Sequence, residues 1–363
     1  MSTAADVTPV RTARAVSLPA SGRPAKAWLM NPWCDLFFLA NCAWPVIVLA
    51  VYLAGKGSSF HVNLSIAFLY FLSTPHRYIT LALVFLDRDR FIEQPRTFVG
   101  IAMVVCLVVA CFWLSLTTIA LLLAIDYVWN SWHFAAQHSG ISRIYGRSSR
   151  PDIVTNGMVE KVVLRTFILY AIFRLASIPV HKLYGSEVDA GIWLRWLQDV
   201  MASAQMLDLP MLALPVFLLV RELVNFRPSM VGRLAYLLSI CGAYSALLVA
   251  VHIHNMHSSS PEWTNLVAGI AMAISIIHSV EYLAIVSWAV KKRHGNRESG
   301  LFAYLVPRWT TALVIFVCTL GLSATLLTLH FFHTFAMVTI IASWLHYAYD
   351  GIIWKAPRRP QPA

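Results

Sequence analysis

The sequence predicts an all-α fold, a polytopic integral membrane helix bundle of about ten transmembrane helices with both termini in the cytoplasm. Three observations support this prediction. Hydrophobic residues make up 58% of the 363-residue chain and charged residues only 12%, about half the charged fraction of a soluble domain. The apolar residues form runs of roughly the 20 residues that a spanning helix needs. Lys and Arg lie in alternate connections between these runs, as cytoplasmic loops do.

Ten apolar runs are candidate spanning helices. They cover residues 33–54, 60–86, 97–114, 117–142, 160–181, 205–221, 233–256, 265–290, 308–329 and 332–354. The apolar stretch from Phe98 to Gly146 is too long for one span, so we divide it near Trp113–Thr117. An even number of spans places both termini on the cationic side of the membrane.

The connections between the runs define the domain organisation. We expect a basic cytoplasmic tail over residues 1–30, a single transmembrane domain over residues 31–355 and a short cytoplasmic tail over residues 356–363. The connection 182–205 carries apolar residues at helical spacing and predicts an outer interfacial helix. The net charge of +11 lies in short loops, which indicates topology and excludes a nucleic-acid partner. We expect an integral protein of the bacterial cytoplasmic (inner) membrane.

Four of the predicted spans carry a histidine on a polar stripe. Residues spaced by three and four positions share one face of a helix. Along the chain the stripes consist of Ser73, His76, Arg77, Thr80 and Asp87; of Asp126, Asn130, His133 and Gln137; of Ser275, His278, Ser279 and Tyr282; and of Thr339, Ser343, His346 and Asp350. Pro75 precedes His76 and removes one backbone hydrogen bond, which can kink that helix.

Histidines at comparable depth in four spans predict a shared metal site. Ionisable residues inside a span are costly and mark functional sites, and neutral imidazole is the commonest metal ligand. The donor set suits non-haem Fe2+ best, and Zn or Cu also fit. A single such histidine would be read as a packing residue. We expect His76, His133, His278 and His346 as metal ligands, and Asp126, Glu281, Asp350 and Arg77 as catalytic residues.

The catalytic residues have separate expected roles. The three carboxylates would orient ligands, ligate the metal or shuttle protons, and Arg77 would bind an anionic substrate group or stabilise an oxygen-derived anion. Arg174 lies deep in the span 160–181 and needs a partner, either Asp126 or a substrate group.

A second group of histidines falls near the outer ends of the predicted spans. It consists of His252, His254, His257, His330 and His333. Histidines at a membrane edge are usually only polar surface residues, but this group could also bind copper or zinc. The sequence leaves these alternatives open.

Three short elements resemble a known family. Thr74-Pro75-His76, the segment from Asn130 to Phe134, and His278-Ser279 resemble the Pro-His-Gly, Ser-x-Trp-His-Phe-Gly and Trp-His-Ser elements of the Brp/Blh family of bacterial membrane β-carotene dioxygenases. The resemblance implies that His76, His133 and His278 hold a non-haem iron that cleaves a polyene with O2. Arg77 stands where that family has glycine.

The sequence therefore predicts an integral membrane non-haem iron oxygenase or oxidase acting on a lipophilic substrate. Its expected partners are the lipid bilayer, that substrate, O2 and an electron donor. Two alternatives use the same histidines: a proton- or ion-coupled transporter, and a haem-binding membrane protein. Phosphate-binding loops of the GxGxxG or Walker A type and a GxSxG nucleophile motif are absent from the sequence.

Overall fold

The computed structural model describes residues 25–55, 58–150, 157–178, 191–257, 260–294 and 304–354, and these residues form helices without strands. Most of the two predicted tails, the beginning of the 182–205 connection and His181 lie outside the described residues. The all-α fold class is confirmed for the part of the chain that the structure describes.

Every predicted span coincides with a helical segment. In chain order the segments are α1 (Pro32–Cys34), η1 (Asp35–Leu39), α2 (Trp44–Ala54), α3 (Ser59–Phe68), η2 (Leu69–Ser73), α4 (Thr74–Phe85), α5 (Arg88–Glu93), α6 (Pro95–Phe112), α7 (Leu116–Ser149), α8 (Met158–Leu175), α10 (Gly191–Ser203), η3 (Ala204–Leu207), α11 (Asp208–Val224), η4 (Pro228–Met230), α12 (Val231–Met256), α13 (Pro261–His294), η5 (Val306–Arg308), α15 (Trp309–His330) and α16 (Phe332–Ile353). The predicted division between α6 and α7 is confirmed, because Ser115 caps α7 by accepting a hydrogen bond from the Thr118 amide.

Five helical stretches are long and apolar enough to cross a membrane. They are Pro32–Ala54, Pro95–Phe112, Pro228–Met256, Pro261–Lys292 and Val306–His330. Only 11% of the most apolar part of Val306–His330 is buried inside the protein, so its exposed surface is suited to lipid. The other predicted spans coincide with shorter or more polar helices, including α4, α7 and α16. The described chain is an all-helical membrane bundle.

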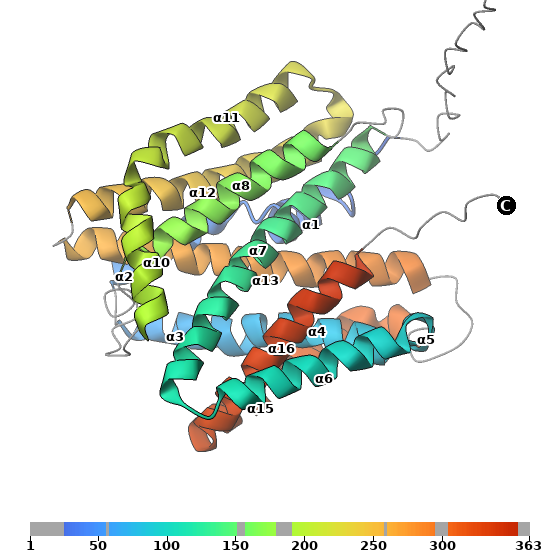
Figure 1. Cartoon of the computed structure of the whole chain (residues 1–363). Coiled ribbons are helices and arrows are strands. Elements are labelled where there is room, and N and C mark those ends of the chain that lie inside the picture. Colours follow the sequence, from blue (N-terminus) through green and yellow to red (C-terminus); the bar gives the residue numbers. More distant parts are fainter. Residues whose placement is uncertain are drawn as a thin grey trace, which may run out of the picture.

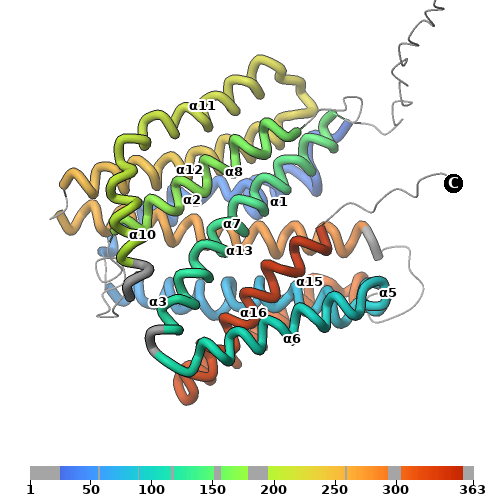
Figure 2. The backbone as a smooth tube through the Cα atoms, viewed as in Figure 1, coloured from blue at the N-terminus to red at the C-terminus, as the bar shows by residue number. Residues whose placement is uncertain are grey.

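The helices form two groups joined by α7 and α13. Helices α8, α11 and α12 pack against one another, and α4, α6, α15 and α16 form the other group. Helix α13 packs against α12 and α2 on one side and α4 on the other, and α7 contacts both groups (Figure 1). The backbone trace shows α7 crossing the bundle obliquely from the end of α6 (Figure 2). The four histidine-bearing helices α4, α7, α13 and α16 therefore lie at the junction of the groups.

Apolar cores surround this junction. One cluster includes Phe167, Ile168 and Leu247, between α8, α12 and their neighbours. A second joins α6, α7 and α16, and a third joins α4, α13 and α15. Polar side chains on the inward faces of α4, α7, α13 and α16 are thus enclosed by apolar packing, which makes unpaired polar atoms there costly.

Candidate metal centre

A distorted stretch of helix places His76. The π-helical turn η2 precedes Thr74, and both the amide and the Oγ1 of Thr74 donate to the carbonyl of Leu69. Pro75 has no amide hydrogen to donate to the turn before it. The π-helical turn accommodates this loss, as such turns often do beside functional residues. The expected perturbation at Pro75 is therefore a π-helical turn that leads directly into His76.

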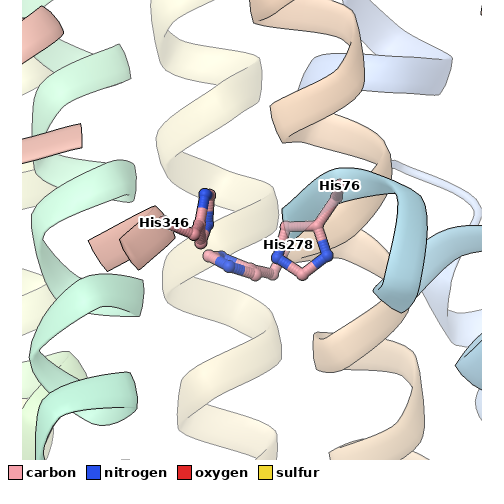
Figure 3. Close-up of side chains that lie close together, drawn as sticks. All are labelled: His76, His278 and His346. Atoms are coloured by element: carbon pink, nitrogen blue, oxygen red, sulfur yellow. The ribbon is translucent and has the colours of Figure 1, made fainter. Parts of the chain in front are cut away.

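The structure brings the four predicted histidines together. His76 comes from α4, His133 from α7, His278 from α13 and His346 from α16, and none is more than 5% exposed. Ligand atoms of His76, His278 and His346 all lie within 4.8 Å of one another, as Figure 3 illustrates. The Nε2 atoms of His346 and His133 are 3.0 Å apart. We call these residues the four-histidine cluster.

The outer ring nitrogens of two cluster residues are held by hydroxyl groups. Nδ1 of His346 is 2.7 Å from Oγ1 of Thr80, and Nδ1 of His76 is 3.4 Å from Oγ of Ser279. Such contacts fix the orientation of an imidazole and leave its other nitrogen available to a ligand.

His278 has a different environment. Its ring lies flat on Phe134, with centroids 3.7 Å apart and an interplanar angle of 9°. Both of its nitrogens are buried, and neither has a hydrogen-bond partner. Buried polar groups are nearly always paired, so this imidazole needs a ligand from outside the chain.

The donor set fits a metal ion. Two nitrogens each ~2.1 Å from one ion lie ~3.4 Å apart in tetrahedral geometry, so side-chain shifts of up to about an ångström would bring the 4.8 Å group into range. Such an ion would satisfy one of the two orphaned nitrogens of His278.

Asp350 is the one predicted carboxylate that joins the cluster. Its oxygens lie 4.0 Å from Nδ1 of His133 and 3.9 Å from Nδ1 of His346. Tyr282 donates a 2.5 Å hydrogen bond to Oδ1, and the Thr80 hydroxyl is 3.3 Å from the same oxygen. Asp350, His133 and His346 form a second group whose ligand atoms lie within 4.8 Å of one another.

Asp126 and Glu281 are placed elsewhere. Asp126 accepts a hydrogen bond from the indole of Trp344 at 3.1 Å, and its seven-residue separation from His133 corresponds to about 10 Å along α7. Glu281 is fully buried, with one oxygen 2.5 Å from the Tyr236 hydroxyl and the other 2.9 Å from Nδ1 of His138. The structure does not bring these two carboxylates into the four-histidine cluster.

Arg77 is available to a ligand. Its side chain is half-buried, and its Nε is buried without a hydrogen-bond partner. Among the described residues no carboxylate forms an ion pair with it. The anion-binding role of Arg77 therefore stays a prediction, and its guanidinium has a nitrogen free to bind an anion.

Arg174 pairs with neither of the partners considered from the sequence. Its guanidinium donates two hydrogen bonds, of 2.7 and 2.9 Å, to the buried carboxylate of Asp208. Tyr170 also donates to this carboxylate, and Nδ1 of His252 lies 2.8 Å from it. Asp208 begins the neighbouring helix α11. Its position opposite Arg174 depends on how α8 and α11 pack, which the spacing of residues along the chain does not show.

The outer histidines do not converge among the described residues. His252 contacts Asp208, and His254 is 3.2 Å from the hydroxyl of Thr264. His257, His330 and His333 are exposed. The described part of the chain therefore offers no three-ligand group from this set.

A cleft opens onto the cluster. It has a volume of about 790 Å³, and His133 and Asp350 lie at its inner end. This volume is within the range of small-molecule sites. Its walls come from α7, α8, α13 and α16, and they include His133 of the four-histidine cluster.

Sequence reasoning missed two features of the site. His138 forms a buried polar group with Glu281, Tyr236 and Tyr244, and its ring lies 6.1 Å from that of His278. This group could have been predicted from Glu281, which lies about 60° from the polar stripe of α13 and therefore needs a partner of its own. The cleft was also missed, although the four-residue spacing of the cations at its mouth was visible in the sequence.

Comparisons of this chain with family models, with curated proteins and with solved structures find no match. The functional argument therefore rests on the geometry of the four-histidine cluster and its cleft.

Proposed function

We propose that this protein is an integral membrane oxygenase or oxidase in which the four-histidine cluster binds non-haem iron and the substrate is lipophilic. The observation that carries this proposal is His278, a fully buried imidazole without a partner for either nitrogen, surrounded by three other imidazoles. Several imidazoles with an adjacent carboxylate are a donor set that suits Fe2+.

Iron bound there would supply the redox chemistry by which O2 oxidises an organic substrate. Thr80 and Ser279 orient the rings of His346 and His76. Asp350 accepts hydrogen bonds from Tyr282 and Thr80 and faces the cleft, so it is placed to hold or pass a proton. Incorporation of a single oxygen atom would also need an electron donor.

The apolar surroundings support oxidative chemistry. Phe134 covers one face of His278, and apolar cores surround the junction except where the cleft reaches His133 and Asp350. Exclusion of water protects reactive intermediates. The proposal includes ten spans, with the cationic connections in the cytoplasm of a bacterial cell.

The packing favours an iron ion over a haem. Ring centroids in the cluster are 4.5 to 5.3 Å apart across four pairs, and Phe134 and Tyr282 fill the adjacent space. A porphyrin between two of these imidazoles would have to displace those rings.

The test is elemental analysis with an optical spectrum of detergent-purified protein, prepared without oxygen and with iron supplementation. We expect stoichiometric iron, no Soret band, and loss of iron in His278→Ala with unchanged membrane insertion. The matched control is His138→Ala, which removes a buried histidine outside the cluster and should retain the iron.

Absence of stoichiometric metal from the wild-type protein would overturn the proposal. The same polar residues would then be examined as a proton or ion path, by pH-dependent flux in proteoliposomes.

A further inference from the structure

The cleft above the four-histidine cluster has an aromatic wall. Trp129, Trp132, Tyr347 and Trp354 are among the residues that line it. Aromatic side chains offer large apolar contact areas, so the wall is suited to a hydrocarbon chain. A purely hydrocarbon ligand, however, would leave the charged residues at the mouth of the cleft without a role.

The mouth carries four cations. Arg143 and Arg147 are one turn apart on α7, and Lys161 and Arg165 are one turn apart on α8. We call these four residues the cationic rim. The acidic residue that lines the cleft is Asp350, at the inner end, and no ion pair of the described residues includes a rim cation.

The rim charges repel one another. Burial and then the charge of Arg143 lower the pKa of Arg147. An anion placed among these groups would relieve their repulsion.

Two contacts show that the rim is built into the cleft. The guanidinium of Arg165 lies 5.0 Å from the centroid of the Trp132 ring, a cation–π contact, and its Nε donates to Oγ of Ser139 at 2.8 Å. Deeper in the cleft, Gln137 donates to the carbonyl of His278 while its buried Oε1 has no partner. The cleft therefore combines cationic and polar groups with aromatic surface.

We propose that the cleft binds a membrane-derived acyl amphiphile, with its anionic headgroup on the cationic rim and its chain along the aromatic wall toward His133 and Asp350. The assignment of the chain, and not the headgroup, as the part that reacts rests on the proposed function. His133 and Arg143 are ten residues apart on one continuous helix, about 15 Å at ~1.5 Å per residue. For a headgroup held by Arg143 and Arg147, the reacting position would thus lie well along the chain.

Topology alone does not account for the rim. The positive-inside bias explains cations in connections on one side of the membrane, but it does not require them to converge on a cleft. Lys291 lies in another connection predicted on the same side, is exposed, and does not line the cleft. It provides a matched control for the loss of one charge.

The test measures laurate binding to the purified protein, with a diazirine-bearing laurate to map the site by cross-linking and mass spectrometry. Dodecanol serves as the uncharged chain and inorganic phosphate as the chainless anion. Because hydrogen bonds to charged groups contribute more than neutral ones, we expect roughly tenfold or greater weakening for dodecanol and for Arg147→Gln/Arg165→Gln. Lys291→Gln should bind as the wild type does, and cross-links should map to the wall around Trp132.

Equal binding of laurate and dodecanol would overturn the proposed headgroup site. Competition by phosphate at the same concentrations as laurate would overturn the amphiphile in favour of a soluble anion. Cross-links outside the cleft would overturn the location. His278→Ala should lose iron and still bind laurate, so a failure of the metal proposal and a failure of the cleft proposal give different results.

Discussion

Replacing His278 with leucine should stabilise the metal-free protein and abolish its stabilisation by metal. His278 is 1% exposed, and both of its ring nitrogens lack partners. In metal-free protein the imidazole is a buried polar group whose donor and acceptor are both unsatisfied. Leucine has a similar bulk and no polar atoms, so it removes that penalty.

The magnitude follows from the contacts of the ring. Each unsatisfied buried group costs about 1–3 kcal/mol. The variant also loses the stacking of the ring on Phe134, which offsets the gain in stability by about 0.5–1.5 kcal/mol. The two groups together cost about 2–6 kcal/mol, so the metal-free variant should be more stable than metal-free wild type by on the order of 0.5–5 kcal/mol. Metal at a hundredfold excess over its Kd would stabilise the wild type by about 2.7 kcal/mol and leave the variant unchanged.

The assay is thermal unfolding in detergent, recorded with chelator and with Fe2+ under anaerobic conditions. The control is His138→Leu, because both ring nitrogens of His138 have hydroxyl partners, Tyr236 and Tyr244. That variant should be less stable than wild type under both conditions, by about 1–3 kcal/mol. If His278→Leu lowers the free energy of unfolding of the chelated protein, or if Fe2+ leaves the wild-type midpoint unmoved, the reasoning is refuted.

Three further predictions concern single contacts. Asp350→Asn should weaken iron binding roughly 10–100-fold by competitive metal titration without lowering the unfolding midpoint, and unchanged affinity would remove Asp350 from the site. Arg174→Met should destabilise the fold by about 3–5 kcal/mol, because it leaves the buried Asp208 carboxylate without its guanidinium partner. Thermal unfolding checks this, and Arg174→Met/Asp208→Leu should recover most of the loss while iron content stays constant in both. Gly321→Ala should lower the free energy of unfolding by about 1–3 kcal/mol, because the added methyl would lie 2.3 Å from a ring carbon of Phe71 in η2. An unchanged unfolding midpoint would show that the Phe71 ring can move aside without loss of stability.

The carboxylates show how far periodicity reaches. Asp126 shares a face with His133 on α7, yet it lies two turns away and pairs with Trp344. Periodicity gives the direction of a side chain around a helix, but the depth at which neighbouring helices meet comes from their packing. Asp350, one turn from His346, lies within reach of the cluster.

Glu281 illustrates the effect of rotation. It is three residues from His278 on α13, which turns it about 60° away from the cluster face. That rotation directs it toward His138 of α7 and Tyr236 of α12. The sequence of α13 alone does not indicate which residues of the neighbouring helices Glu281 contacts.

The sequence by itself determined the helical class, the apolar runs, the division between α6 and α7 and the polar stripes, because hydropathy and helical period are local properties of the chain. Only the tertiary structure decided that the stripes of α4, α7, α13 and α16 face one another, that Arg174 pairs with Asp208, and that four cations of α7 and α8 line one cleft. Those contacts join residues up to about two hundred and seventy positions apart, and their geometry depends on how the helices cross, which no local pattern encodes.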